Sequence, residues 1–331
     1  MRLCVIPGDG IGQEVLPEAL RVLRALAPDV ELSEAQMGWA VFQETGTALP
    51  DSALEAARNA DAVLFGAVAS PSHPVPGYRS PIVAMRRALQ LYANIRPTTL
   101  ESGASLVVVR ENTEDLYLGR ERLEDDGATA IAERVITRAA SERIARAAYD
   151  LARRRKAAGD GPGKVTIVHK ANVLRVSDGL FRESTLAVAR EYDDLVTEEL
   201  LVDTAAMHLA RTPERFDVIV TTNMFGDILS DIAAVHGGGL GLASSANYGT
   251  SQALFEPVHG AAPDIVGKQI ANPLAAISCI GMFLEWAGRA GAAQRLQQAV
   301  AAVVREGPHT PDLGGQAHTA DLTEAVLARL A

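Results

Sequence analysis

The sequence is organised around one stretch, Val218-Ile219-Val220-Thr221-Thr222-Asn223-Met224-Phe225-Gly226-Asp227-Ile228-Leu229-Ser230-Asp231. It begins as a short β-branched run, which is typical of a buried strand. Two threonines and an asparagine come next, and side chains of these types can cap the N-terminus of a helix. The stretch therefore predicts a buried strand, a polar turn and a helix in succession.

That helix carries Asp227 and Asp231. A spacing of four residues puts both carboxylates on one helical face, where like charges repel. A bound divalent cation would offset the repulsion, since hard cations such as Mg²⁺ prefer carboxylate oxygens. The alternative is a pair of solvated aspartates on an exposed face. The apolar neighbours Ile228, Leu229 and Ile232 favour the metal site.

Composition narrows the class of protein. The 331 residues suffice for two domains or one large α/β unit, and 48% of them are hydrophobic, enough for a large core. The net charge of −10 argues against general nucleic-acid binding, which requires a basic surface. Cys4 and Cys279 stand alone in apolar segments and predict buried thiols rather than a disulfide framework.

Targeting signals are not evident in the sequence. The apolar run at the N-terminus is too short for a signal peptide. No stretch approaches the roughly 20 apolar residues that span a bilayer. We therefore expect a cytoplasmic protein without a membrane partner.

The remaining elements are predicted from apolar runs and their breaks. Gly8, Gly10 and Gly12 come after the first strand, but their spacing differs from the G-x-G-x-x-G dinucleotide fingerprint. Residues 254–265 are expected to form a loop with free N–H groups, which can hold phosphates. Strands are predicted at 3–6, 62–65, 106–109 and 165–168, and helices at 13–27, 83–91, 139–158, 273–286 and 319–330.

Several charged residues stand next to these predicted elements. Arg96 and Arg110 each end an apolar run, and with Arg86 they could clamp a carboxylate or phosphate, because guanidinium binds such groups bidentately. Lys170 ends a strand and is a candidate base if burial lowers its pKa. Asp203 is a third carboxylate after a strand-like run. The alternatives are surface ion pairs and a surface lysine.

Six segments in this order resemble the β-decarboxylating dehydrogenases, the family of isocitrate, isopropylmalate, homoisocitrate and tartrate dehydrogenases. The resemblance covers almost the whole chain. The segments are Pro7-Gly8-Asp9-Gly10-Ile11-Gly12, Tyr92-Ala93-Asn94-Ile95-Arg96-Pro97, Arg110-Glu111-Asn112-Thr113-Glu114-Asp115-Leu116-Tyr117, His169-Lys170-Ala171-Asn172, Asn223 to Asp231 and Glu256-Pro257-Val258-His259-Gly260.

The resemblance implies an α/β fold that differs from the Rossmann fold, with a large mixed sheet flanked by helices. It implies two domains with a cleft: a discontinuous cofactor-side domain of 1–98 plus 245–331, and a dimerisation and metal/substrate domain of 99–244. It also implies a homodimer, or a dimer of dimers, in which the lysine and one metal aspartate reach the partner's site.

The resemblance also assigns roles to residues. Tyr117 matches the acid that protonates the enolate, and Lys170 the base that takes the hydroxyl proton. Asn172 is expected beside the substrate and the nicotinamide. Arg86, Arg96 and Arg110 match the clamp on the substrate carboxylates. Asp203, Asp227 and Asp231 match the ligands of Mg²⁺ or Mn²⁺.

The cofactor implied is NAD. Asp264 matches the residue that holds the adenosine ribose, and a carboxylate there would repel the 2′-phosphate of NADP. The next residue, Ile265, stands where NADP enzymes of the family have tyrosine. The other expected cofactor contacts are Val68, Ala69, Ser70, Asn172, Glu256, His259, Gly260, Ala261, Ala262, Pro263 and Asn272.

The substrate is expected to be a tricarboxylate-type hydroxy acid, chosen by the segment from Ser70 to Val83. The loop from Ser70 to Tyr78 resembles that of homoisocitrate dehydrogenases, and an apolar Val83 weakens the case for isocitrate. Homoisocitrate is therefore favoured, which would place the enzyme in lysine biosynthesis through 2-aminoadipate. Isopropylmalate, isocitrate and tartrate remain alternatives. A metal-dependent phosphohydrolase or an inactive relative would leave Lys170 and Tyr117 unexplained.

Overall fold

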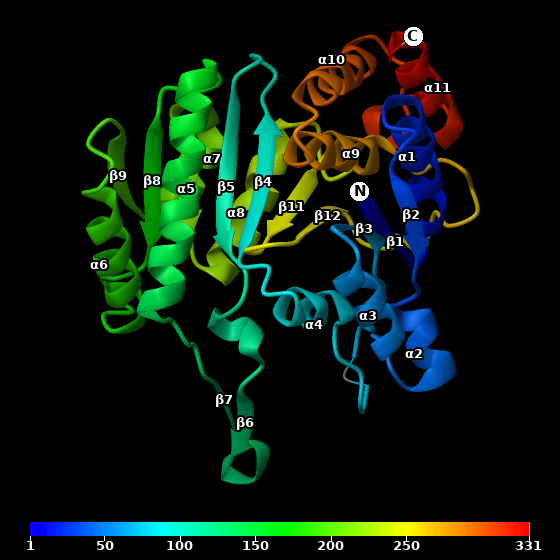
Figure 1. Ribbon diagram of the computed structural model, residues 1–331. Helices are drawn as coiled ribbons and strands as arrows, with labels where there is room; N and C mark the ends of the chain where they lie inside the picture. Colours follow the sequence, from blue (N-terminus) through cyan, green and yellow to red (C-terminus); the bar gives the residue numbers. More distant parts are fainter. Residues whose placement is uncertain (74, 331) are drawn as a thin grey trace. The chain divides into compact units, whose positions relative to one another are not determined.

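The computed structural model describes residues 1–73 and 75–330. The chain folds into two compact units, which are coloured in sequence order in Figure 1. Unit 1 is discontinuous and comprises Met1–Leu89 with Gly238–Ala331, and unit 2 comprises Gln90–Gly237. The domain boundaries implied by the resemblance, 98 and 244, lie a few residues later and stay a prediction.

Unit 1 is built on strands in the order β2-β1-β3-β12-β11. β1 is parallel to β2 and β3, β12 is parallel to β3, and only the β11–β12 pair is antiparallel among the described pairs of this unit. The strands are β1 (Arg2–Gly8), β2 (Glu31–Glu34), β3 (Ala62–Ala67), β11 (Ser244–Tyr248) and β12 (Ala253–Pro257).

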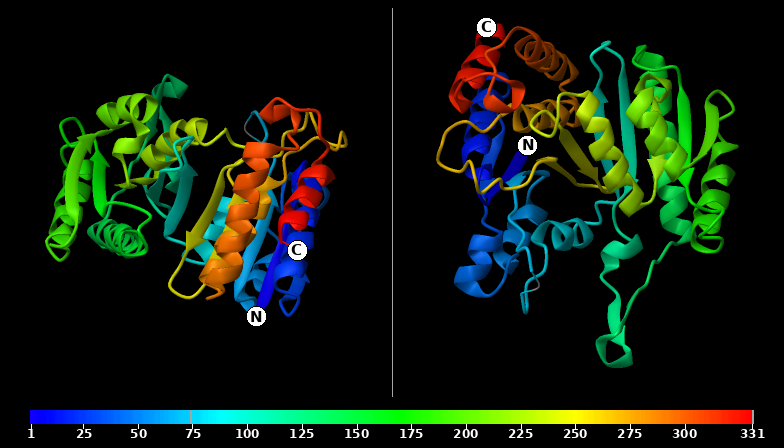
Figure 2. Two further views of the ribbon diagram at one scale, coloured as in Figure 1. Left: turned by 90° about the horizontal axis from the view of Figure 1, so that it is seen from above. Right: turned by 180° about the vertical axis from the view of Figure 1, so that it is seen from behind.

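The core of unit 1 lies between this sheet and its helices. α1 and α9 contact each other and the sheet, and α10 and α11 pack on them (Figure 2). Phe255 and Phe283 meet edge to face at 5.8 Å within that core. The helices are α1 (Gly12–Leu26), α2 (Trp39–Thr45), α3 (Asp51–Asn59), α4 (Pro81–Ala88), α9 (Leu274–Trp286), α10 (Ala290–Glu306) and α11 (Thr319–Leu330), with a short 3₁₀ turn η4 (Pro311–Leu313).

Unit 2 has strands in the order β4-β5-β10-β8-β9. β4 is antiparallel to β5, and the other pairs are parallel. β10 has a neighbour on each side and is fully buried, which explains its run of β-branched residues. The strands are β4 (Ala93–Thr99), β5 (Ser105–Glu111), β8 (Lys164–His169), β9 (Val196–Leu201) and β10 (Val218–Thr221).

Helices cover both faces of this sheet. α5 and α6 lie on one face, and α7 and α8 on the other (Figures 1 and 2). Leu229 of α8 and Leu209 of α7 are fully buried in a core with Ile219. The helices are α5 (Arg138–Ala158), α6 (Ser177–Ala189), α7 (Val202–Arg211) and α8 (Asn223–His236), with 3₁₀ turns η1 (Asp115–Leu118), η2 (Asp125–Gly127) and η3 (Pro213–Arg215).

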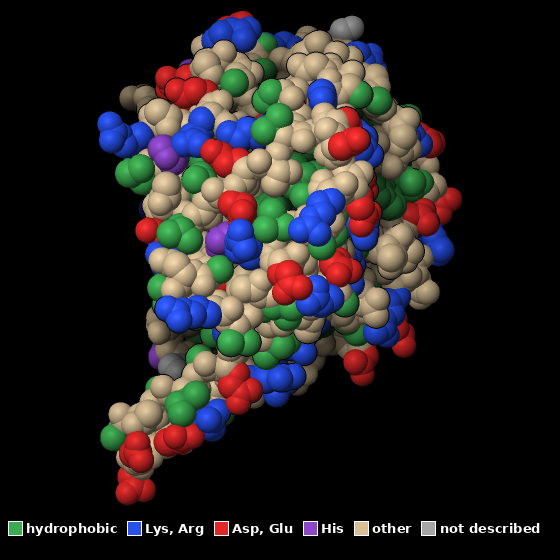
Figure 3. Space-filling view, turned by 90° about the vertical axis from the view of Figure 1, so that its left-hand side faces the viewer, with side chains coloured by type: hydrophobic (Ala, Val, Ile, Leu, Met, Phe, Trp, Pro, Cys, Tyr) green, Lys and Arg blue, Asp and Glu red, His purple; other side chains and the backbone are tan. Residues whose placement is uncertain are grey.

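A two-stranded arm, formed by antiparallel β6 (Glu121–Glu124) and β7 (Thr129–Ala132), extends away from the sheet of unit 2. β6 is exposed along its whole length. Figure 3 shows acidic and basic side chains interspersed on the face it draws, with acidic residues gathered at the tip of the arm, where Asp125 and Asp126 lie. Among the described residues, no helix combines the length and the apolar character needed to cross a membrane.

The structure confirms the predicted strands and helices within a few residues, with two corrections. Residues 254–257 are a buried strand, β12, rather than the start of a loop, because the run pairs with both β3 and β11. Arg96 lies in the middle of β4 rather than at the end of an apolar run, because the strand continues through Pro97. Cys4 and Cys279 are buried free thiols, as predicted.

The glycine turn after β1 has a packing role. Gly10 has a φ of +56°, and a Cβ there would lie 2.1 Å from the carbonyl oxygen of Ala261. The next residue, Ile11, donates its N–H to that same oxygen at 3.0 Å. A left-handed conformation and a close backbone approach together require glycine. The turn thus supports the loop after β12 instead of forming a dinucleotide fingerprint.

Candidate functional site

The start of α8 is held by a residue from another segment. Thr222, one of the three polar residues that could cap the helix, stands at the N-cap position, but its side chain makes no capping hydrogen bond. Instead Oδ2 of Asp115 accepts the N–H of Met224 at 3.1 Å. Asp115 is fully buried, and its carboxylate also suits the positive end of the helix dipole. The first turn of α8 is therefore fixed to η1, which carries Tyr117.

Asp227 and Asp231 face the same arginine, as their spacing predicts. Arg96 Nη2 lies 3.2 Å from Asp227 Oδ1, and Arg96 Nη1 lies 3.6 Å from Asp231 Oδ1. Arg110 forms a second ion pair with Asp227. Burial raises the pKa of Asp231, and the nearby charge of Arg96 acts against that shift. Within unit 2, the two arginines offset the repulsion between the aspartates.

Neutral side chains orient both guanidinium groups. Arg96 donates from Nε to Asn94 Oδ1 at 2.8 Å and from Nη1 to Ser230 Oγ at 2.7 Å. Arg110, which is only 1% exposed, donates from Nε to Asn223 Oδ1 at 2.8 Å. Ordered donors of this kind suit recognition of a substrate carboxylate. Asn94 lies two residues before Arg96 on β4, so the period of a strand puts both side chains on one face. No sequence pattern indicated Ser230, which is 134 residues away from Arg96 along the chain.

A glycine allows α8 to approach Arg110. A Cβ on Gly226 would lie 2.6 Å from both Cβ and Cγ of Arg110. Atoms that close must move apart, so a larger residue would displace either the helix or the arginine. Gly226 therefore sets the distance between Arg110 and Asp227, the next residue of the helix.

Tyr117 also belongs to this group. Its hydroxyl donates to Asp227 Oδ2 at 2.5 Å, and the guanidinium carbon of Arg110 lies 4.9 Å from the centre of its ring. Burial raises the pKa of Tyr117, and the hydrogen bond to Asp227 acts in the same direction. The phenol thus keeps its proton at neutral pH and can act as a proton donor.

Lys170 and Asp203 form a separate pair. Nζ of Lys170 donates to Oδ1 of Asp203, which lies in the first turn of α7, just after β9. That hydrogen bond holds the pKa of Asp203 below its usual value. Asn172, two residues after Lys170, lies on an exposed turn. In the part of the chain that the structure describes, no three acidic, histidine or cysteine residues are grouped closely enough to hold a metal.

The carboxylates of Asp227 and Asp231 fit a divalent cation. They are hard oxygen ligands on one helix face, and their side chains are 38% and 57% exposed, so an ion can reach them. Mg²⁺ commonly takes one or two carboxylates and completes its shell with water and substrate oxygens. A single chain therefore supplies two of the three predicted ligands at one place.

Unit 1 holds the third predicted arginine. Arg86 Nη2 donates to Glu256 Oε1 at 2.5 Å, and Asn247 Nδ2 donates to the same oxygen at 2.8 Å. The side chains of Arg86 and Glu256 are 10% and 7% exposed, which makes this a buried pair. Glu256 was predicted to contact the cofactor. Its carboxylate is engaged by Arg86 and positions that arginine.

The loop after β12 contains the residues expected to hold the cofactor. Nε2 of His259 is buried and has no hydrogen-bond partner among the described residues, and Nδ1 lies 3.0 Å from the carbonyl oxygen of Gly260. Burial lowers the pKa of His259, which keeps the ring neutral. An unpartnered buried polar atom needs a partner, and a polar ligand would supply one, so the loop fits a cofactor.

The rest of this loop presents its backbone and one carboxylate. Ala262 has a φ of +42°, an unusual conformation for a residue with a side chain. Such outliers are concentrated at ligand-binding segments. Gly260, Pro263 and Asp264 are exposed, while Ala261 is buried.

Asn272 has a structural role that the sequence did not indicate. Its Nδ2 donates to Asp312 Oδ2 at 3.0 Å, and its Oδ1 accepts the N–H of Leu274 at 2.9 Å. The second bond caps the start of α9. Asp312 was missed in the sequence because an isolated aspartate in a loop carries no periodic signal.

Asp9 anchors Ala69, the residue before the expected substrate loop. Asp9 is buried and accepts N–H groups from Trp39 at 2.7 Å, Ala40 at 3.0 Å and Ala69 at 2.9 Å. Three backbone donors satisfy a buried carboxylate. The acidic residue of the glycine turn thus fixes the start of the substrate loop.

An aromatic cluster anchors the other end of the loop. The ring of Tyr78 meets those of Trp39 and Phe42 edge to face at 5.3 and 5.2 Å, and its hydroxyl donates to the carbonyl oxygen of Ala69 at 3.0 Å. Ser70 is exposed, and Val68 and Val83 are partly buried. Pro74, part of the predicted loop, lies outside the described residues.

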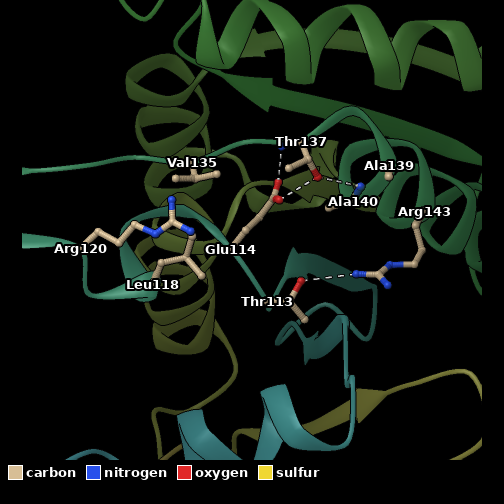
Figure 4. A pocket seen from close by; sticks show the side chains of 9 residues that line it. All are labelled: Thr113, Glu114, Leu118, Arg120, Val135, Thr137, Ala139, Ala140 and Arg143. Atoms are coloured by element: carbon tan, nitrogen blue, oxygen red, sulfur yellow. Dashed lines mark hydrogen bonds between the residues drawn. The ribbon is translucent and has the colours of Figure 1, made fainter.

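Unit 2 has a cavity of about 460 Å³, lined by residues that include Thr113, Glu114 and Thr137 (Figure 4). It includes none of Asp227, Lys170 or Tyr117, so we do not assign the chemistry to it. Glu114 points into it, and its carboxylate accepts both the N–H and the hydroxyl of Thr137 at 2.8 Å. Burial is the main cause that raises the pKa of Glu114 to about 7.

Comparison with known proteins gives a consistent result. A family model described as isocitrate/isopropylmalate dehydrogenase matches residues 2–326. An isocitrate/homoisocitrate dehydrogenase of Thermus thermophilus is 49% identical, covering 99% of this chain and 98% of that protein. A 3-isopropylmalate/3-methylmalate dehydrogenase of Methanocaldococcus jannaschii is 48% identical, with coverage of 99% and 98%. A solved isocitrate dehydrogenase from Methylococcus capsulatus is 42% identical, covers 99% of each chain and has a TM-score of 0.93.

Proposed function

Because the chain belongs to the isocitrate/isopropylmalate dehydrogenase family, we propose that it is a cytoplasmic, NAD-dependent homoisocitrate dehydrogenase. As a member of that family it is a β-decarboxylating 2-hydroxy acid dehydrogenase with the matching α/β fold. Under the proposal it converts homoisocitrate and NAD into 2-oxoadipate, CO₂ and NADH. It would serve lysine biosynthesis through 2-aminoadipate.

The observation that carries the proposed chemistry is the cluster around Asp227. Arg96 and Arg110 would bind the malate-like carboxylates of the substrate, and the resemblance assigns the same role to Arg86. Tyr117, whose pKa is raised, would donate a proton to the carbon that loses CO₂. A cation held by Asp227 and Asp231 would act as a Lewis acid toward the substrate oxygens.

Lys170 would take the proton of the substrate hydroxyl while hydride passes to the nicotinamide. This role needs an ammonium group that can lose its proton and a position near the hydroxyl. Lys170 is partly buried, at 26% exposure of its side chain, and is paired with Asp203. Asp203 would thereby orient the base before the substrate arrives.

We propose a homodimer in which Lys170 and Asp203 reach the partner's Asp227. Two features support it. Lys170 and Asp203 form a pair of their own, apart from the Asp227 cluster in the same chain. The two helices that carry the aspartates also expose large apolar side chains, namely Met207 at 48%, Ile228 at 53% and Val235 at 72%. Burial of such side chains drives association.

The preference for NAD over NADP rests on Asp264. Its carboxylate is exposed at the loop after β12, in the position that the resemblance assigns to the adenosine ribose. There it would accept hydrogen bonds from the ribose hydroxyls and repel a 2′-phosphate. The unpartnered Nε2 of His259, in the same loop, would gain a partner from the cofactor.

The choice of homoisocitrate rests on the substrate loop and on Val83. An apolar side chain at that position does not favour the shorter isocitrate. A longer substrate could extend its distal carboxylate past Val83 toward Arg79 or His73, both exposed. The relative from T. thermophilus carries both homoisocitrate and isocitrate in its name. Isocitrate and 3-isopropylmalate are the alternative substrates.

The experiment is a comparison of kcat/KM for homoisocitrate, isocitrate, 3-isopropylmalate and tartrate, each with NAD and with NADP in the presence of Mg²⁺. Formation of NADH or NADPH is monitored by absorbance. We expect the highest value for homoisocitrate with NAD. A higher value for another acid would refute the choice of substrate and leave the reaction class in place. No reduction of either cofactor with any acid would refute the proposed chemistry.

A further inference from the structure

Arg134 joins the segments that carry Lys170 and Tyr117. It lies between β7 and α5, and its guanidinium donates from Nε to Asp115 Oδ1 at 2.6 Å and from Nη2 to Thr222 Oγ1 at 2.8 Å. It also forms an ion pair with Asp178. Both carboxylates are fully buried, and the side chain of Arg134 is 11% exposed.

Each partner of Arg134 holds a segment of the proposed site. Asp115, two residues before Tyr117, accepts the N–H of Met224 at the start of α8. Asp178 Oδ2 accepts the N–H of Lys170 at 2.6 Å. One side chain therefore connects η1, the first turn of α8 and the turn that begins at Lys170.

We propose that Arg134 is a positioning residue for the reaction, which fixes the Lys170 turn relative to Tyr117 and Asp227; the inference rests on the proposed function. Arg134 acts through Asp115 and Asp178, which hold the segments that carry those side chains. A planar guanidinium can reach two carboxylates and a hydroxyl at once, whereas an ammonium offers a single point charge. Without it, two fully buried carboxylates would lose their ion pairs.

The backbone of Asp115 shows that this arrangement is imposed. Its φ is +75°, a conformation that residues with side chains rarely adopt. Such a conformation persists only where surrounding bonds hold it. Here the Asp115 carboxylate is held by the guanidinium of Arg134 and by the backbone N–H groups of Met224 and Leu116. The N–H of Leu116 lies 2.9 Å from Asp115 Oδ1. In the proposed dimer, Arg134 would also link the acid of one site to the base of the partner's site.

The test uses Arg134→Met and Arg134→Gly in the full-length enzyme. A displacement of a catalytic group by about 1 Å can cost about 100-fold in rate. We expect kcat to fall by about that factor in Arg134→Met, while KM for the hydroxy acid changes by less than about threefold. Arg134→Gly should recover part of its kcat when methylguanidinium is added. The matched control is Arg138→Met, which removes an exposed arginine paired with exposed Glu183.

The outcomes separate this inference from the proposed function. If Lys170→Ala is inactive while Arg134→Met keeps the kcat of the wild type, the inference on Arg134 is wrong and the proposed chemistry stands. If Lys170→Ala remains active, the proposed chemistry is wrong. Should Arg134→Met not fold, the triple variant Arg134→Met, Asp115→Asn, Asp178→Asn removes the buried charges together and keeps acceptors for both N–H groups. A wild-type kcat in that folded variant would also refute the inference.

Discussion

The hydroxyl of Tyr117 donates to Oδ2 of Asp227 at 2.5 Å, while Oδ1 of the same carboxylate lies 3.2 Å from Arg96 Nη2. One oxygen thus faces the proposed proton donor, and the other faces a cation of the proposed substrate clamp. The proposed acid and the proposed clamp thus meet at Asp227, which is itself a proposed metal ligand. A change to any one of these neighbours should therefore alter a distinct part of the reaction.

Tyr117→Phe should separate proton donation from ring packing. Phenylalanine keeps the aromatic face toward Arg110 and removes the hydroxyl. We expect kcat to fall by about 100-fold or more, the usual contribution of a positioned acid, with a smaller change in KM. Steady-state assays measure both. Tyr149→Phe is the control, since it removes a buried hydroxyl bonded to Thr197 outside the cluster. Equal losses in the two variants would contradict the role of Tyr117.

Lys170→Ala should separate oxidation from decarboxylation. Without the base, the hydroxyl proton is not removed, so formation of NADH from the hydroxy acid should be abolished. Decarboxylation of a supplied β-keto acid does not need that proton transfer and should largely survive in the presence of Mg²⁺. The two reactions are measured by absorbance and by CO₂ release. A comparable loss of both reactions would show that Lys170 does not act as the base.

Asp264→Lys together with Ile265→Tyr should shift the cofactor preference toward NADP. The substitution removes the carboxylate that would repel a 2′-phosphate. The new ammonium group can form a charge-assisted hydrogen bond with that phosphate, which is stronger than a neutral one. The ratio of kcat/KM for NADP to that for NAD measures the change. Lys268→Ala, a change of an exposed charge near the same loop, serves as the control. An unchanged ratio in the double variant would mean that the ribose lies elsewhere.

Gly226→Ala should lower both stability and substrate affinity. The new methyl group would meet Arg110 at 2.6 Å. Overpacking of this kind costs about 1–3 kcal/mol, and displacement of Arg110 should raise KM. The matched control is Gly179→Ala in α6, where nothing lies within 4 Å of the added Cβ. That variant should be about 0.4–1 kcal/mol more stable than the wild type. Urea unfolding and KM test both expectations.

Glu114 should make stability depend on pH. Its pKa is raised from 4.5 to about 7 in the folded protein, chiefly by burial. Between these values the folded protein holds a proton that the unfolded chain has lost, so the free energy of unfolding falls as pH rises through this window. Glu114→Gln should remove the contribution of this carboxyl to the slope of the free energy of unfolding against pH. Denaturant unfolding from about pH 4.5 to 7.5 tests it, with exposed Glu183→Gln as control; parallel curves for wild type and Glu114→Gln would contradict it.

Features that depend on local periodicity are well predicted from the sequence. β10 and α8 appear where a β-branched run gives way to a helical pattern, and Asp227 and Asp231 share one face because their spacing requires it. β8 and β5 were also predictable, since buried parallel strands are continuous apolar runs. The ends of elements were less predictable. β4 continues through Pro97, a residue that usually marks a break.

Contacts between distant segments could not be predicted from the sequence. Asp115 accepts an N–H at the start of α8 from more than a hundred residues away, whereas the local sequence offers only the Thr-Thr-Asn turn as a cap. The carboxylate of Glu256 binds Arg86 across the fold of unit 1, a contact that no spacing indicated, and its contact with the cofactor stays a prediction. The role of Arg134 could not be predicted from spacing, because Asp115, Asp178 and Thr222 come from three separate segments. Such contacts depend on the tertiary fold, and no spacing along the chain records them.

The two anchors of the substrate loop bear on how substrate preference can change during evolution. Asp9 holds Ala69 and the aromatic cluster holds Tyr78, so both ends are fixed by residues outside the loop. The residues between them can therefore be exchanged as one cassette, without redesign of the sheet or of the Asp227 cluster. Lineages that share the same chemistry can then diverge in the acid they oxidise through a short segment of sequence.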